Sequence, residues 1–159
     1  MSVKEAFTAE QWRMVGSAPF LVGMFVAGSS PSGPIGMLTE MLAAEKAVTL
    51  EASQPDGLPL VREIEADLVA EHLTRDLGTI DGSPAGQERV LRELGRALGI
   101  VDAHARAEAS AFRAWLYRVA QHVVRAAPEG GPVTAGRTFV SDEETAALTT
   151  LGELLGVPR

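Results

Sequence analysis

The three histidines of this sequence, His72, His104 and His122, are its best candidates for acid–base or transition-metal chemistry, because histidine titrates near neutral pH. His104 and Glu108 are four residues apart, which predicts one shared helical face, and His122 lies further along, beyond reach of a shared metal. Glu71 directly precedes His72, whereas di-iron bundles need Glu-x-x-His spacing. We therefore expect histidines at the surface or core edge, and an enzyme using His104 or His122 is the least favoured function.

Motifs of common catalytic and nucleotide-binding sites are absent from the sequence. There is no cysteine, which excludes thiolate metal sites, cysteine nucleophiles and disulfides. Glycine-rich stretches at 28–36 and 130–136 follow no predicted strand and lack the Gly-Lys-Ser/Thr ending of a phosphate-binding loop. No Gly-x-Ser-x-Gly motif of a serine hydrolase occurs. We therefore predict a protein that is not an enzyme and has no organic cofactor.

Charge and hydropathy restrict the partners and the compartment. The 14 Lys and Arg against 21 Asp and Glu give a net charge of −7, which repels nucleic acid and anionic membrane surfaces. The N-terminal residues show no secretory signal, which predicts a cytoplasmic protein. The apolar stretch 14–27 is shorter than the roughly 20 residues of a spanning helix, which predicts a buried helix and no membrane span.

Apolar residues recur at helical spacing, and end signals divide the chain into about six helices of an all-α bundle. Ser83 before Pro84, and Ser141 three residues before Glu144, are typical helix starts. Glu63, Asp67 and Glu71 form the polar stripe of an amphipathic helix, and only 138–140 alternates like a strand. The predicted helices cover about 8–28 with a kink at Pro19, then 37–52, 61–72, 84–98, 100–127 (the longest) and 142–155.

The uncharged stretch 16–37 is more apolar than one face of a small domain requires. Gly23 and Ala27 within it permit close helix approach. Any exposed part of this stretch would be a surface for a protein partner or a homo-oligomer, with Phe20, Met24 and Phe25 as contact residues. This surface is the basis of the favoured function, an interaction module.

The two ends of the chain show a faint internal repeat. Trp12 and Glu40 are separated by the same interval as Trp115 and Glu143, and each pair spans a helix, a Gly/Pro/Ser loop and a second helix. Duplication would place two terminal hairpins around a pseudo-two-fold axis, each covering the apolar face of the other. Chance similarity between two amphipathic helix pairs is the alternative.

Residues 119–131 and 140–156 form a helix, a loop and a Ser-x-x-Glu helix start, and this pattern resembles the TerB-like, tellurite-resistance helical family. The resemblance covers about a quarter of the chain. The whole chain is also similar to uncharacterised bacterial proteins with a Trp near the start, an Ala-Pro in the first helix and the Phe-x-x-Trp-Leu found here at 112–116. That second likeness implies no activity.

The TerB-like resemblance implies a stress-associated bacterial domain that binds a divalent cation through acidic residues. This sequence departs from the pattern, with Gly28-Ser29-Ser30 and Pro128-Glu129 where acidic residues are expected. The metal ligands that the resemblance leaves are Glu40, Glu143 and Glu144, with Glu129 as a further carboxylate. One cation site usually needs several converging carboxylates.

With 46% hydrophobic residues, the chain 1–159 is long enough to form one domain with its own core. The favoured function is a non-catalytic helical interaction or stress-associated module. Carboxylate-based cation binding is the alternative, and an enzyme of unknown class comes last.

Overall fold

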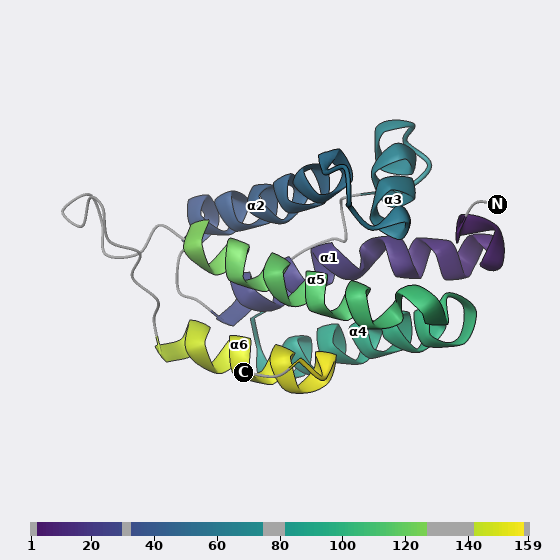
Figure 1. The fold of residues 1–159 in the computed structure, drawn as a ribbon. Helices are drawn as coiled ribbons and strands as arrows, with labels where there is room; N and C mark the ends of the chain where they lie inside the picture. The colour runs from purple at the N-terminus through teal and green to yellow at the C-terminus, as the bar shows by residue number, and fades with distance from the viewer. Residues whose placement is uncertain (1–2, 30–32, 75–81, 127–141, 158–159) are drawn as a thin grey trace.

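The computed structural model describes residues 3–29, 33–74, 82–126 and 142–157, with side chains from residue 39 onward in the second of these ranges (Figure 1). Over these residues the chain is helical and contains no strand, which confirms the all-α fold. A short 3-10 helix, η1 (Val3–Ala6), precedes six α-helices. These are α1 (Ala9–Ser29), α2 (Gly33–Ser53), α3 (Pro59–Val69), α4 (Pro84–His104), α5 (Arg106–Ala126) and α6 (Asp142–Leu155).

Helix α1 is the centre of the bundle, because it packs against α2, α4, α5 and α6 (Figure 1). Every residue from Ala18 to Ala27 is buried, so the helix has no solvent-facing side there. A helix covered on all sides must be apolar all round, which explains the uncharged stretch.

The predicted interaction residues belong to this buried part of α1. Phe20, Met24 and Phe25 are only 1%, 8% and 6% exposed. They are core residues, and the exposed surface expected around them does not exist in the described fold. The excess of apolar residues serves a helix with neighbours on every side instead of a surface for a partner.

The terminal hairpins, α1–α2 and α5–α6, pack reciprocally. Helix α2 packs against α5, and α6 packs against α1, as a pseudo-two-fold arrangement requires. Buried positions match when the halves are offset by 104 residues, one more than the tryptophan alignment. Matched buried pairs are Trp12 with Leu116, Val15 with Val119, Phe20 with Val124, Glu40 with Glu144, Ala43 with Ala147 and Ala47 with Leu151.

The predicted longest helix, 100–127, is wrong. Helix α4 continues to His104 and α5 begins at Arg106, with Ala105 between them at φ −137° and ψ 50°. No glycine or proline marks this break, and the antiparallel packing of α4 on α5 stabilises it. His104 and Glu108 therefore lie on different helices, and the Glu108 carboxylate accepts a hydrogen bond from the Leu60 amide at 3.2 Å.

Several helix ends follow their sequence signals. The Thr8 and Gln11 side chains accept hydrogen bonds from each other's backbone amides at 3.1 and 2.9 Å, a capping box. Ser83 Oγ accepts from the Gly86 amide at 3.1 Å, and Gly156 ends α6 at φ 67°.

Helix α1 continues through Pro19. The predicted strand at 138–140, the cap Ser141 and the carboxylate Glu129 lie outside the described residues.

Over the described ranges, no helix combines enough length with enough apolar character for a membrane crossing. This agrees with the sequence, in which the stretch 14–27 was too short.

Close approach of α1 and α2 depends on Gly23, as the sequence predicted. A Cβ at Gly23 would lie 3.0 Å from Ala44 Cβ, whereas a Cβ at Gly99 would have no neighbour within 4 Å. We expect Gly23→Val to lower the free energy of unfolding by about 1–3 kcal/mol through overpacking. Gly99→Val is the matched control, and it should be neutral or slightly stabilising because valine is the better helix former. Urea unfolding measures both, and equal effects would contradict the packing argument.

Candidate functional site

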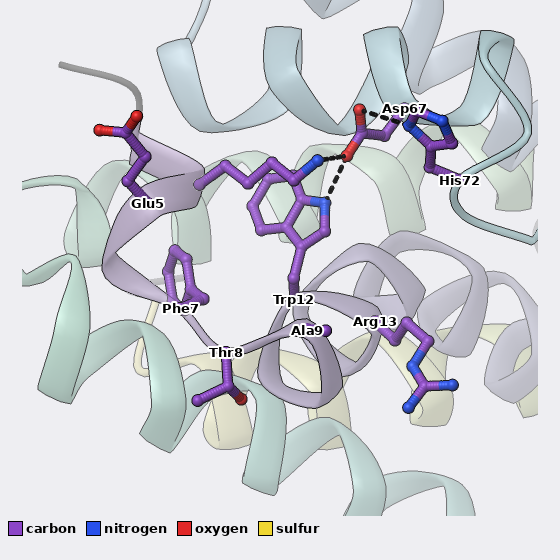
Figure 2. Close-up of a pocket in the computed structure, with 9 residues that line it drawn as sticks. Glu5, Phe7, Thr8, Ala9, Trp12, Arg13, Asp67 and His72 are labelled. Carbon is purple, nitrogen blue, oxygen red and sulfur yellow. Dashed lines mark hydrogen bonds and ion pairs between the residues drawn. The ribbon is translucent and has the colours of Figure 1, made fainter.

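A pocket of about 820 Å³ opens where η1, the start of α1 and the end of α3 meet (Figure 2). The capping box of Thr8 and Gln11 starts α1 at this point and turns the chain from η1 into the helix. The wall combines aromatic, cationic and acidic side chains from segments far apart in sequence. The lining residues are Lys4, Glu5, Phe7, Thr8, Ala9, Trp12, Arg13, Asp67 and His72.

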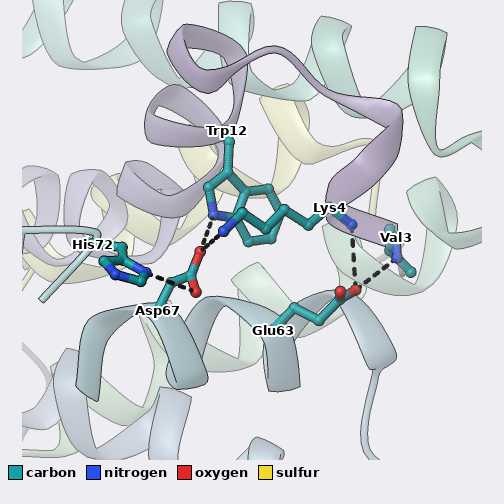
Figure 3. Close-up of polar contacts among 6 residues, drawn as sticks. All are labelled: Val3, Lys4, Trp12, Glu63, Asp67 and His72. Carbon is teal, nitrogen blue, oxygen red and sulfur yellow. Dashed lines mark hydrogen bonds and ion pairs between the residues drawn. The ribbon is translucent and has the colours of Figure 1, made fainter. Parts of the chain in front are cut away.

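Asp67 is the hub of this pocket (Figure 3). Its Oδ2 accepts a hydrogen bond from Trp12 Nε1 at 2.8 Å and forms an ion pair with Lys4 Nζ at 2.6 Å. His72 Nδ1 lies 3.6 Å from Oδ1. The Asp67 side chain is only 14% exposed, so these groups replace the water that it lost on folding.

The pKa of Asp67 reflects these neighbours. Burial raises the pKa, but hydrogen bonds from Lys4, Trp12 and His72, with the charge of Lys4, outweigh burial and bring the pKa below the ordinary value of 3.8. Asp67 is therefore ionised near neutral pH. A carboxylate held in its charged form by Lys4 and Trp12 acts as a structural anchor and is poorly suited to take up a proton.

Further contacts fix η1 to the bundle. Glu63 Oε2 accepts from the backbone amides of Val3 and Lys4 at 2.8 and 3.3 Å (Figure 3). Phe7 contacts Trp12 and His104, with ring centroids 5.7 and 6.0 Å apart. Two residues of the polar stripe of α3, Glu63 and Asp67, thus hold the N-terminal segment in place.

The end of α3 turns His72 back over Asp67. The backbone amides of His72 and Leu73 donate to the Asp67 carbonyl oxygen at 2.8 and 3.2 Å. Glu71 adopts a φ of 62° in this cap, a left-handed conformation that usually favours glycine. The turn therefore places the imidazole at the rim of the pocket, where it is 66% exposed.

Another concave surface lies between α2 and α5, and we call it the α2–α5 groove. It consists of two adjoining hollows of about 450 and 210 Å³ that share His122. Leu42 and Leu50, two turns apart on α2, are 55% and 44% exposed. The titratable side chains that line it are Glu51 and four basic residues, Lys46, Arg118, His122 and Arg125.

The structure separates the predicted metal ligands by burial. Glu40 and Glu144 are fully buried, at 0% exposure, whereas Glu143 is exposed. Among the residues that the structure describes, no three His, Cys, Asp or Glu side chains lie close enough together to hold a metal ion. Glu40 and Glu144 are equivalent under the 104-residue offset, so the carboxylate that the repeat pairs with Glu40 is Glu144 instead of Glu143.

His72 and His104 are exposed and His122 is half-buried, which agrees with the prediction of histidines at the surface or core edge. His104 packs on Phe7, and its Nε2 lies 3.3 Å from Gln11 Nε2. Sequence reasoning missed Lys4 and Asp67 as site residues. The one available signal was Trp12, because a buried indole N–H needs an acceptor. Nothing in the sequence indicates that this acceptor lies 55 residues away.

Comparison of the chain with family models, with curated proteins and with solved structures gives no match. The resemblance to TerB-like proteins therefore remains a prediction.

The Asp67 hub predicts acid-sensitive stability. The folded-state pKa is lowered, so its stabilising effect is complete well above 3.8 and is lost as the pH falls through 3.8 toward the folded-state value. Asp67→Ala should cost about 1–3 kcal/mol at neutral pH, because the Trp12 N–H loses its acceptor. Asp67→Asn should cost less, because it keeps an acceptor oxygen.

Urea unfolding at several pH values, followed by tryptophan fluorescence, measures these effects. Asp67→Asn should flatten the acid limb of the stability curve, and the same change at the exposed Asp56 should not. An unchanged acid limb in Asp67→Asn would refute the assignment.

Proposed function

We propose that this protein is a non-catalytic helical interaction module that binds a protein partner through the α2–α5 groove. The observation that carries the proposal is the pair of exposed leucines, Leu42 and Leu50, on one face of α2 beside hollows in the surface. Exposed leucines that line a concave surface are typical of interaction sites. The surface differs from the one that the sequence suggested, but the class of function is the same.

The chemistry of the η1–α1–α3 pocket supports a non-catalytic role. Asp67 and Lys4 are bound to each other, and Asp67 also accepts the indole hydrogen of Trp12. These interactions join η1, α1 and α3, so both groups contribute to the fold. The resemblance to TerB-like proteins adds a proposed stress-associated role in the bacterial cytoplasm.

Site-specific photo-crosslinking in cells tests the groove. Leu50→benzoylphenylalanine should give a discrete adduct with a partner, and Leu42→Lys in the same chain should remove it. Val69 is the matched control, because it is an apolar residue on α3 that is 68% exposed. Val69→benzoylphenylalanine should give no such adduct. Identical adducts from both positions, or none from either, would refute the interaction module.

Cation binding by carboxylates is the second candidate, and the burial of Glu40 and Glu144 favours it. Two fully buried glutamates at equivalent positions of two hairpins indicate a shared role. Burying a carboxylate costs free energy unless other groups or a cation compensate it. A cation held in either hairpin would take Glu40 or Glu144 as a ligand, whereas Glu143 is exposed to solvent.

Thermal melting with and without millimolar calcium or manganese tests this candidate. A cation at a hundred times its dissociation constant stabilises the fold by about 2.7 kcal/mol, which should raise the melting temperature by several degrees. Glu144→Gln should abolish the cation-dependent rise, and Glu143→Gln should retain it. A melting temperature that no cation changes would exclude cation binding in that concentration range.

A further inference from the structure

We infer that the partner presents an acidic amphipathic helix to the α2–α5 groove. This inference rests on the proposed function and adds the chemistry of the partner. It follows from the spacing of the leucines, from the sign of the charges around them and from the exposure of those charges at the α2–α5 groove.

The apolar contacts of the groove match the repeat of a helix. Leu42 and Leu50 are eight residues apart on α2, so they are about 12 Å apart along the helix axis. A partner helix laid along the groove would place apolar residues two turns apart against them. Ala43, Ala47 and Val119 line the hollows between α2 and α5, and their small side chains leave room for such residues.

The charged contacts of the groove are basic, although the whole chain has a net charge of −7. Lys46 lies midway between the two leucines. Arg118, His122 and Arg125 follow one another at helical spacing on α5 and line the same hollows. A groove that combines these cations with exposed leucines complements a helix with apolar residues on one face and carboxylates beside them.

Among the residues that the structure describes, Glu51 is the one acidic side chain that lines the groove, and it already has partners. Its Oε1 lies 3.5 Å from Arg118 Nη2, and its Oε2 accepts from the Leu58 amide at 3.0 Å. The described residues that line the hollow beside Leu42 include no acidic side chain. The positive character is therefore strongest around Lys46 and Arg125.

The corresponding face of the other half is not open. Under the 104-residue offset, His122 corresponds to Ala18 and Arg125 to Leu21, and both of these α1 residues are buried in the core. Helix α1 packs against α4 as well as α6. Lys46, Arg118 and Arg125 are exposed instead, so the α2–α5 groove is the half of the bundle where basic side chains can meet another molecule.

Titration of the isotopically labelled full chain with two designed peptides tests the inference. The first is a helical peptide of about 20 residues with leucines two turns apart and glutamates beside them. The second is identical except that lysine replaces each glutamate. We expect the acidic peptide to bind, to shift the backbone resonances of α2 and α5 but not those of η1 and α3, and to bind more weakly as salt increases.

Charge reversal provides the matched comparison. The double variant Lys46→Glu, Arg125→Glu should weaken binding of the acidic peptide by about tenfold or more, since like charges then face each other. The control Arg92→Glu, Arg96→Glu makes the same change of net charge at exposed positions on α4 and should bind normally. Circular dichroism verifies that both variants fold.

Four results would overturn the inference: no binding, equal binding of both peptides, tighter binding of duplex DNA, or a dimer in light scattering that Lys46→Glu, Arg125→Glu dissociates. The last would make a second copy of this chain the occupant. A Leu50 photo-adduct that persists although the acidic peptide fails to bind would retain the interaction module and refute only the acidic helix. Loss of both would refute the two proposals together.

Discussion

Burial of α1 on every side is the constraint on which the rest of the structure depends. One apolar helix from the N-terminal half contacts four of the other five helices, so the described core is organised around it. Because its middle residues have no route to water, the sequence must be uncharged there, and glycine must replace larger residues where α2 approaches. The same burial removes Phe20, Met24 and Phe25 from any contact with a partner in the folded chain.

With α1 enclosed, contacts with other molecules are left to the periphery, and two of the concave surfaces there differ in chemistry. In the η1–α1–α3 pocket, the charged groups mainly satisfy one another around Asp67, and the result is attachment of the N-terminal segment. In the α2–α5 groove, leucines remain exposed among cations. Internal compensation of charge is what a fold requires, whereas exposed apolar and basic groups together indicate recognition of another molecule.

The near repeat of the two hairpins shows which positions share their surroundings and which do not. Positions that the halves share, such as the buried Glu40 and Glu144, belong to what the hairpin needs or to a property that both copies retain. Positions that differ follow their burial, since Leu21 is enclosed in the bundle whereas Arg125 at the equivalent position is exposed. Aligning the two tryptophans gives an offset one residue smaller than the 104 residues that match the buried positions. The larger offset describes the structure because burial, and not residue identity, sets how two helix pairs correspond.

The sequence by itself determined the all-α class, most helix ends and the buried nature of the first long helix, because periodicity, caps and the absence of charge are local properties. Only the tertiary structure decided the break at Ala105, the Asp67 hub and the identity of the exposed leucines. Each of these depends on residues brought together from distant parts of the chain, as Trp12 and Asp67 are. The periodicity of a sequence does not show which polar stripe packs against another helix or which apolar residue remains exposed to solvent. The arrangement of the neighbouring helices determines both.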